Sequence, residues 1–226
     1  MNKTLPEGKK LNCFLQSMAE INEATAEIQN YSLIPHGLSC KNWDIMRILP
    51  RIKDGDFCDL GADGSFILNN LAHCGHVGKK YGIDLQFAAD REEGEIKYFK
   101  GDLMHTPFAD GEFETLTCLS VVEHSVSYSE LAKECARLLK PGGQLFLTCD
   151  YWTPKPDTSL TKLYSLDWNI LDRANVEELV AEMEKVGLKI TSDINWATNE
   201  QVINPSYCSP VQGVSYTFGI FHFIKS

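Results

Sequence analysis

The stretch Phe57-Cys58-Asp59-Leu60-Gly61-Ala62-Asp63-Gly64-Ser65 decides the fold of this chain. A short apolar strand runs into a carboxylate and a glycine turn, and the apolar residues Phe66-Ile67-Leu68 then begin a helix. This layout is typical of nucleotide-binding α/β proteins, in which glycine lets the backbone approach a ligand above a helix N-terminus. An ordinary α/β turn with two glycines has the same residues, so the rest of the chain must decide between the two interpretations.

The same turn excludes two common phosphate-binding motifs. A dinucleotide-binding G-x-G-x-x-G loop needs glycine where this chain has Asp63, and a P-loop needs a lysine that the turn lacks. Carboxylates at Asp59 and Asp63 would repel a phosphate group, whereas they would attract an ammonium or sulfonium group. The turn therefore favours a positively charged ligand.

Two more predicted strands lead to acids. The run Lys79-Lys80-Tyr81-Gly82-Ile83-Asp84 ends in a carboxylate that is placed to accept hydrogen bonds from both hydroxyls of an adenosine ribose. The next run, Ile96-Lys97-Tyr98-Phe99-Lys100-Gly101-Asp102, ends in a carboxylate that can accept a hydrogen bond from the exocyclic amine of adenine. Together these acids predict an adenosine site at one edge of a sheet.

Two later segments complete the pattern. Residues 113–122 predict a fourth strand, which leads into the polar pair Glu123-His124. The run Leu138-Leu139-Lys140-Pro141-Gly142-Gly143-Gln144-Leu145-Phe146-Leu147 contains a helix stop, a tight turn and a fifth strand. In order and spacing, these pieces resemble the class I S-adenosylmethionine-dependent methyltransferases, most closely their broad small-molecule group.

The resemblance covers roughly residues 55–150 and departs from the family's D-x-G-x-G-x-G loop at Asp63 and Ser65. It implies S-adenosylmethionine as the cofactor. The cofactor contacts that we expect are Asp59, Gly61, Ala62, Asp63, Gly64, Asp84, Leu85, Asp102, Leu103, Leu119 and Ser120.

Helical patterns alternate with short apolar runs along the whole chain. We expect helices at about 8–29, 42–49, 65–74, 127–139 and 174–186, and strands at about 56–60, 80–84, 95–100, 115–119, 144–149, 188–193 and 214–223. Such alternation favours α/β architecture, because parallel strands need crossover connections. The expected fold is a doubly wound, mostly parallel seven-stranded sheet with helices on both faces, a Rossmann-like methyltransferase fold. The resemblance implies an antiparallel last strand.

The methyl acceptor should lie against the segments outside the shared cofactor motifs. We expect residues 1–50 to form a helical cover segment and residues 51–226 to form the cofactor-binding domain, with a substrate loop near 150–170. The prolines and aromatic residues of that loop favour a small polar acceptor such as a sugar or a glycan-pathway metabolite, although a lid packed on the sheet edge would use the same residues. The candidate substrate contacts are Tyr31, His36, Lys41, Tyr151, Trp152 and Trp168.

Catalysis of methyl transfer consists mainly of alignment and exclusion of water, with a general base where the acceptor is a hydroxyl. His124 follows the fourth strand, where the cofactor should face the acceptor, and we predict that it is this base. Glu123 would orient it or tune its charge. In the resembling family such a Glu-His pair also serves as scaffolding, which is the alternative interpretation.

Composition limits the other classes of function. The chain of 226 residues has a formal net charge of −10, and no Lys- or Arg-rich stretch provides the basic patch that nucleic acid requires. No apolar run reaches the ~20 residues that span a bilayer. The segment Met1-Asn2-Lys3-Thr4-Leu5-Pro6 lacks the apolar core of a signal peptide. We therefore expect a cytoplasmic protein without membrane or nucleic-acid partners.

Neither disulfides nor metal sites are predicted. The eight cysteines are scattered without any C-x-x-C pair, so they indicate no disulfide framework and no structural zinc. The run His73-Cys74-Gly75-His76 lies at a predicted helix end, where capping explains it better than metal binding.

Two other classes of function compete with methyl transfer. A nicotinamide-dependent oxidoreductase would share the fold, but the glycine at position 63 and a Tyr-x-x-x-Lys pair are missing. A noncatalytic cofactor-binding or regulatory protein is the other alternative, and Asp63 and Ser65 are the features that favour it.

Overall fold

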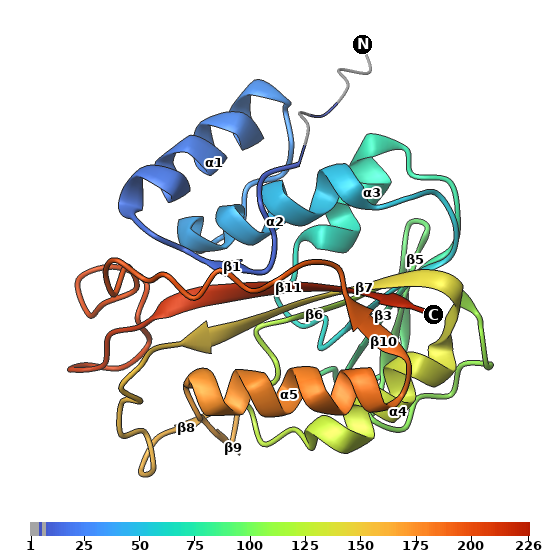
Figure 1. The fold of residues 1–226 in the computed structure, drawn as a ribbon. Helices are drawn as coiled ribbons and strands as arrows, with labels where there is room; N and C mark the ends of the chain where they lie inside the picture. The colour runs from blue at the N-terminus through green and yellow to red at the C-terminus, as the bar shows by residue number, and fades with distance from the viewer. Residues whose placement is uncertain (1–4, 6–7) are drawn as a thin grey trace.

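A computed structural model describes residue 5 and residues 8–226 of the chain. Its centre is a nine-stranded sheet, drawn in Figure 1 with helices above and below it. Along the sheet the strands follow the order β1 (Cys13–Phe14), β11 (Thr217–Lys225), β7 (Leu139–Tyr151), β6 (Phe113–Leu119), β2 (Phe57–Leu60), β3 (Lys80–Asp84), β5 (Ile96–Lys100) and β4 (Arg91–Glu93). Strand β10 (Leu188–Ile190) also pairs with β11.

The five central strands, from β7 to β5, run parallel, and β11 is antiparallel to its neighbours. All seven predicted strands are therefore present, and the doubly wound α/β fold is confirmed. Two short edge strands, β1 and β4, were not predicted. Strand β4 consists of exposed Arg91, Glu92 and Glu93, which give no apolar strand signal, and it pairs with β5 as an antiparallel hairpin.

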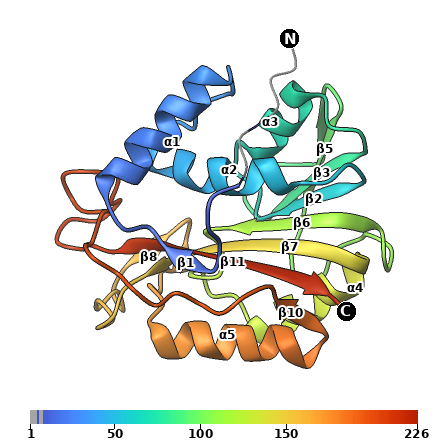
Figure 2. The same ribbon diagram turned by 45° about the horizontal axis from the view of Figure 1, so that its top comes forward.

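Helices cover both faces of the sheet, as the turned view in Figure 2 also shows. One face carries α1 (Met18–Asn30), α2 (Asn42–Ile48) and α3 (Ile67–Cys74), and the other carries α4 (Tyr128–Leu138) and α5 (Arg173–Lys185). Two short 3-10 turns, η1 (Ser39–Lys41) and η2 (Leu49–Arg51), flank α2. Because both faces of the sheet are covered, strands such as β2 are buried at every residue, which explains their continuous apolar pattern.

The N-terminal segment differs from the predicted helix over 8–29. Helix α1 begins only at Met18, and β1 precedes it as an edge strand paired with β11. Asn12 has a φ of 53°, a turn conformation, and its side-chain amide donates to Ser192 Oγ at 2.8 Å. This hydrogen bond and the pairing of β1 with β11 hold the segment in an extended path along the sheet before the helix starts.

The later helices have caps that fix their ends. Ser127 accepts a hydrogen bond from the Glu130 amide at the start of α4, and Asp172 forms a capping box with Asn175 at the start of α5. Helix α3 ends at Gly75, whose φ of 74° is a left-handed conformation that glycine adopts without strain. The predicted bounds of α3, α4 and α5 agree with the observed ones to within two residues.

No helix of the described residues is long and apolar enough to cross a membrane. The stretch on which the signal-peptide argument rests, residues 1–6, lies outside the described residues except for Leu5.

Candidate active site

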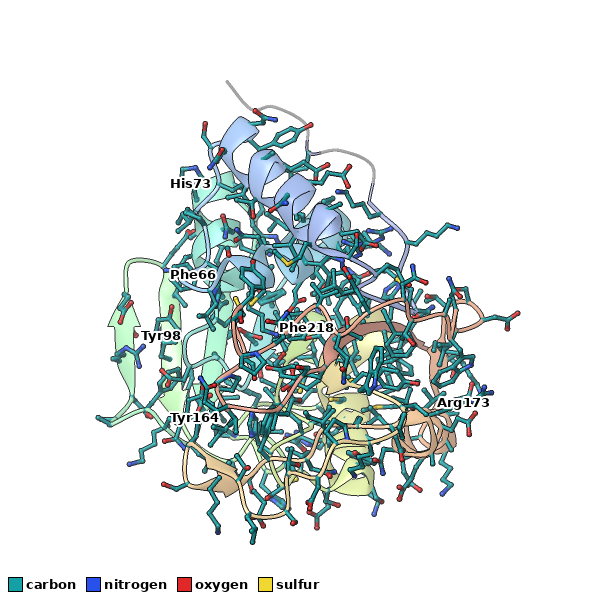
Figure 3. All side chains as sticks on the ribbon, turned by 90° about the vertical axis from the view of Figure 1, so that its left-hand side faces the viewer. Phe66, His73, Tyr98, Tyr164, Arg173 and Phe218 are labelled. Atoms are coloured by element: carbon teal, nitrogen blue, oxygen red, sulfur yellow. The ribbon has the colours of Figure 1, made fainter. Side chains whose placement is uncertain are left out.

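A pocket of about 550 Å³ lies beyond the carboxyl ends of the parallel strands. This is the edge at which open α/β sheets bind ligands. Figure 3 views that side of the molecule, on which Phe66, Tyr164 and Phe218 lie. The pocket walls come from the glycine turn after β2, the tips of β3, β5 and β6, the segment before α2, and a hairpin formed by β8 (Lys162–Leu163) and β9 (Leu166–Asp167).

Gly61 is the residue of the glycine turn that no other amino acid could replace. Its φ is +83°, and a Cβ atom at this position would lie 2.3 Å from Cγ2 of Val121. Asp63 and Ser65 stand where the resembling family has glycine, yet neither has a positive φ. Their backbone conformation is therefore open to any residue, which explains how the turn keeps its shape without these glycines.

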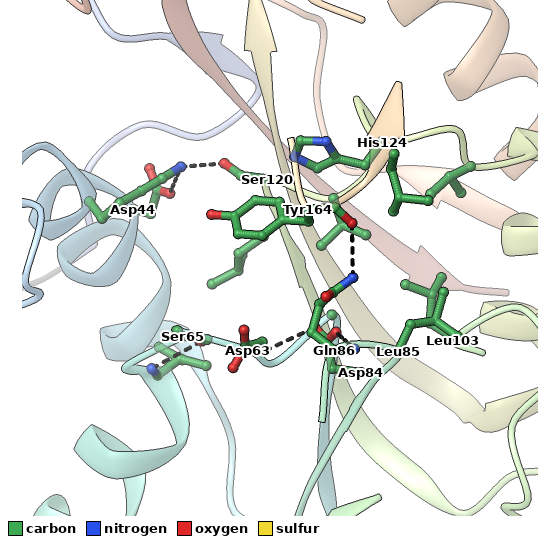
Figure 4. A pocket seen from close by; sticks show the side chains of 18 of the residues that line it. Asp44, Asp63, Ser65, Asp84, Leu85, Gln86, Leu103, Ser120, His124 and Tyr164 are labelled. Atoms are coloured by element: carbon green, nitrogen blue, oxygen red, sulfur yellow. Dashed lines mark hydrogen bonds and ion pairs between the residues drawn. The ribbon is translucent and has the colours of Figure 1, made fainter. Parts of the chain in front are cut away.

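The turn is hydrogen-bonded to the tip of β3. The amides of Gly61 and Ala62 donate to the Ile83 carbonyl, at 2.8 and 3.1 Å. The Asp63 amide donates to Asp84 Oδ2 at 2.9 Å, and the Gln86 amide donates to Asp84 Oδ1 at 2.7 Å. Figure 4 shows Asp63, Asp84 and Gln86 together at one end of the pocket. Asp84 is thus a carboxylate held in place by two amides at the pocket wall, with Leu85 beside it.

Asp102 occupies the equivalent position after β5. Its two oxygens accept hydrogen bonds from the Met104 amide at 2.9 Å and from His105 Nδ1 at 3.0 Å. Asp102, Leu103 and Met104 line the pocket together, which combines a hydrogen-bond acceptor with an apolar wall as an adenine ring would require.

Asp102→Asn tests this assignment. The asparagine amide can accept from the amine of adenine or donate to the carbonyl of hypoxanthine, whereas a carboxylate can only accept. We expect the preference for S-adenosylhomocysteine over its inosine analogue to fall by about tenfold, the free-energy equivalent of one charge-assisted hydrogen bond. Isothermal titration with both ligands measures the ratio, and an unchanged ratio would place the adenine elsewhere.

Asp59 does not contact the pocket, contrary to the prediction that it binds cofactor. It is fully buried beneath the glycine turn, where Thr117 Oγ1 donates to its Oδ1 at 2.6 Å. Burial raises the pKa of Asp59 to about 7, while the hydroxyls of Ser65 and Thr117 oppose that rise. Ala62 is also buried and does not line the pocket, so both residues support the turn from below.

The raised pKa of Asp59 predicts how the free energy of unfolding depends on pH. In the unfolded chain this group ionises near 3.8, so folding is penalised as pH rises from there to about 7. Asp59→Asn removes the penalty. We expect the unfolding free energy of the variant, relative to wild type, to increase by about 2–3 kcal/mol between pH 5 and 8. Urea titrations of the ligand-free proteins measure it, with the exposed Asp90→Asn as the control; a constant difference would contradict the prediction.

The other end of the pocket contains a partly buried cation. Lys41 Nζ donates to Asp44 Oδ2 at 3.2 Å and to Ser120 Oγ, and it lies 3.8 Å from the centre of the Phe218 ring. Burial alone would lower the pKa of Lys41, but Asp44, Asp150 and Glu123 raise it above the ordinary value, so the ammonium stays charged. Ser120, at the end of β6, has a φ of 55°, an uncommon conformation that often marks functional sites.

His124 lines the same end of the pocket. Its ring lies edge-on to Tyr164, with centroids 5.6 Å apart, and its Nδ1 has no hydrogen-bond partner in the part of the chain that the structure describes. Burial and the nearby Lys41 charge lower the pKa of His124 to about 4, so the imidazole is neutral at physiological pH. A neutral ring with a free nitrogen is able to accept a proton.

Glu123 does not orient His124. It is fully buried, lies outside the pocket, and its carboxyl oxygens have no hydrogen-bond donor within the described residues. Burial and the neighbouring Asp150 raise the pKa of Glu123 well above its usual range, although Lys41 opposes the shift. Its effect on His124 is therefore not a direct hydrogen bond.

Two of the six predicted substrate contacts, His36 and Lys41, line the pocket. His36 Nδ1 accepts from the Leu38 amide at 2.9 Å, which leaves Nε2 to donate to the Gly64 carbonyl at 2.9 Å. Both ring nitrogens are thus engaged, and burial lowers the pKa of His36 below its ordinary value. His36 therefore ties the N-terminal segment to the glycine turn.

The predicted contacts Tyr31, Tyr151, Trp152 and Trp168 do not line the pocket. Tyr151 is buried against Phe14, with ring centroids 4.0 Å apart. Trp168 is also buried, and its indole N–H donates to Asp150 Oδ2 at 2.9 Å. The loop aromatics are therefore packing residues, as the alternative interpretation held.

Asp44, Gln86 and Tyr164 are among the lining residues that the sequence analysis missed. Asp44 follows Lys41 at a helical i,i+3 spacing, which is a usable but weak signal. Gln86 and Tyr164 lie in turns without a motif, so no pattern in the sequence identifies them.

Comparison with known proteins agrees with the geometry of this pocket. The model of a family described as a methyltransferase domain matches residues 58–147, which hold the glycine turn and the strand tips that line the pocket. Over residues 58–147 the chain is thus similar to a methyltransferase domain, in agreement with the resemblance to class I S-adenosylmethionine-dependent methyltransferases.

Curated relatives of this methyltransferase domain are named for quinone pathways. A ubiquinone biosynthesis O-methyltransferase of Xanthomonas oryzae is 46% identical over 109 residues, which are 42% of this chain and 43% of the relative. A demethylmenaquinone methyltransferase of Lactococcus lactis is 27% identical over 154 residues, 59% of this chain and 61% of the relative. The chain thus spans less than two thirds of either relative.

Among solved structures, the geranyl diphosphate C-methyltransferase of Streptomyces coelicolor has a TM-score of 0.62 at 16% identity, with 91% of this chain and 83% of that chain covered. It was solved with S-adenosyl-L-homocysteine. At this identity the similarity establishes the fold alone.

Within the described residues, no group of three or more His, Cys, Asp or Glu side chains is arranged to hold a metal ion. The eight cysteines are free thiols.

Proposed function

We propose that this chain transfers a methyl group from S-adenosylmethionine to a hydroxyl of a small, largely apolar aromatic acceptor. The observation that carries the proposal is the single pocket that joins the carboxylates of Asp84 and Asp102 to an apolar end containing Lys41 and His124. Cofactor and acceptor could therefore meet within one cavity of about 550 Å³.

The residues at the first end fit the cofactor. Asp84 would hold the ribose hydroxyls, Asp102 and Leu103 the adenine, and the turn at Gly61 and Asp63 the methionine part. The acids Asp63, Asp84 and Asp102 give this end the negative charge that suits a sulfonium. When bound, the cofactor supplies an activated methyl group.

The residues at the second end favour an aromatic acceptor over a sugar. Its walls are mostly apolar and include Leu38, Ile45, Val121, Val126 and Leu166. A sugar would leave its hydroxyls unpaired against such walls, which is costly. The relatives named for ubiquinone and demethylmenaquinone point the same way, and nothing supports the predicted sugar or glycan acceptor.

Lys41 and His124 would divide the work of ionising the acceptor hydroxyl. The fixed ammonium of Lys41 stabilises negative charge on the acceptor oxygen as its proton leaves. His124 Nε2, which unlike Nδ1 is not among the buried unpaired atoms, would accept that proton, and the bound cofactor would supply the activated methyl group to the oxygen. The apolar walls exclude water from this step.

Two measurements test the proposal. Isothermal titration should show binding of S-adenosylmethionine and S-adenosylhomocysteine, and no binding of NAD. Transfer of labelled methyl to a panel of catechols and hydroxylated aromatic rings should then be detected, with sugars as the comparison. Cofactor binding without transfer to any member would favour the noncatalytic alternative, and binding of NAD would favour an oxidoreductase.

A further inference from the structure

The hairpin of β8 and β9 covers the pocket with a strained turn. Its two central residues, Tyr164 and Ser165, have φ values of 56° and 67°, a conformation that favours asparagine and glycine. Residues other than glycine are strained in this conformation. The ion pair between Lys162 and Asp167 is exposed on both sides and contributes little. A two-stranded hairpin of this kind depends on contacts outside itself.

Gln86 supplies one such contact. Its side-chain Nε2 donates to the Tyr164 carbonyl at 3.2 Å, while its own amide donates to Asp84 Oδ1 at 2.7 Å. Figure 4 shows both bonds as dashed lines in one continuous path. A chain of two hydrogen bonds thus connects the carboxylate expected to bind ribose to the tip of the hairpin.

The tip of the hairpin faces the acceptor end of the pocket. The Tyr164 ring lines the pocket beside His124, yet 64% of the residue is exposed. Single exposed apolar residues are common on protein surfaces, so what matters here is that the ring lies over the pocket beside His124. A flat aromatic acceptor placed next to His124 would cover the ring and gain a stacking contact.

We infer that Gln86 couples cofactor binding to acceptor binding by placing Tyr164 over the acceptor. A ribose bound to Asp84 immobilises the turn from Asp84 to Gln86, and Gln86 then holds the strained hairpin in the position that receives an aromatic ring. Binding of the first ligand already orders the hairpin. The second ligand then loses less conformational entropy on binding, so it binds more tightly. This inference rests on the proposed function for the class of acceptor, and it makes Gln86 a positioning residue.

The test measures binding and needs no turnover. The acceptor probe is 4-nitrocatechol and the cofactor probe is S-adenosylhomocysteine, each titrated calorimetrically in the presence and absence of the other. We expect each ligand to tighten the other by about tenfold in the wild type. In Gln86→Leu the tightening should fall below about twofold.

Hydrogen exchange gives a second readout. Residues 161–168 should gain protection on addition of S-adenosylhomocysteine in the wild type, and they should not in Gln86→Leu. The matched control is Gln16→Leu, because Gln16 Nε2 also donates to a distant carbonyl, that of Ala197 at 2.7 Å, but lies outside the pocket. The control should keep the wild-type tightening and protection.

A second variant tests the coupling by relieving the strain of the hairpin turn instead of removing its contact with Gln86. Ser165→Gly relieves the left-handed strain, so the hairpin should be protected even without cofactor, and the probe should bind more tightly to the ligand-free protein. Equal tightening in wild type and Gln86→Leu would overturn the inference, as would a hairpin whose protection ignores the cofactor. Absence of methyl transfer alongside intact coupling would contradict the proposed function and leave the role of Gln86 standing.

Discussion

Asp84→Ala is expected to weaken binding of S-adenosylhomocysteine by about 10²–10⁴, because two charge-assisted hydrogen bonds to the ribose are lost at about 1.5–3 kcal/mol each. The carboxylate accepts hydrogen bonds from the amides of Asp63 and Gln86, so its loss would also leave these two amides without their acceptor. Isothermal titration measures the loss directly.

The control for this prediction is Asp90→Ala. Asp90 is an exposed acid directly before the edge strand β4. Its Oδ1 accepts a hydrogen bond from the Lys100 amide at 2.8 Å, but Asp90 does not line the pocket. The Asp90→Ala protein should bind S-adenosylhomocysteine with the affinity of the wild type. Circular dichroism and thermal unfolding establish that both variants are folded, and a folded Asp84→Ala protein with unchanged affinity would remove Asp84 from the cofactor site.

The fold was predictable because burial on both faces leaves a continuous signal in the sequence. Strand β2 and most of β6 are buried, so their apolar runs stand out, and the acids that follow β3 and β5 are conspicuous by contrast. Strands β1 and β4 could not be found in this way. Their two or three residues are held by pairing with a neighbouring strand, which leaves no pattern in a single sequence.

The cofactor end of the pocket was predictable for a related reason. A parallel sheet brings the ends of β3 and β5 to one edge, so the sequence positions of Asp84 and Asp102 already imply proximity. Asp59 was predicted to contact the cofactor because the sequence does not show how deeply a residue is buried. It lies near the end of β2 much as Asp84 ends β3, yet it is fully buried and does not line the pocket.

The acceptor end was predicted less well, because it depends on side-chain burial in loops. Trp168 looked like a rim residue, but its indole N–H finds a buried partner in Asp150, which lets the whole ring leave solvent. Tyr164, four residues earlier, stays exposed because the tight turn projects it over the pocket. The same loop thus offers both kinds of aromatic residue, and only the three-dimensional path of the chain separates them.

His124→Ala should lower methyl transfer by about 10²–10⁴ while affinity for S-adenosylhomocysteine changes little, if His124 is the general base. His124 does not hydrogen-bond to Glu123, and its Nδ1 has no partner within the described residues, so replacement removes no hydrogen bond at that nitrogen. Single-turnover rates with saturating cofactor measure the effect. The exposed His73→Ala is the control and should retain the wild-type rate.

Two further measurements on turnover concern the role of His124: its dependence on pH and its dependence on the pKa of the acceptor hydroxyl. Because burial and Lys41 lower the pKa of His124 to about 4, the imidazole stays neutral as pH falls from about 8 to about 6, the range in which an ordinary histidine would gain a proton. Turnover should therefore not decline over that range through protonation of His124. The loss in His124→Ala should also shrink for acceptors whose hydroxyl has a low pKa, since these need less help to ionise. A variant that loses thermal stability or cofactor affinity in step with its activity would instead assign His124 to the scaffold.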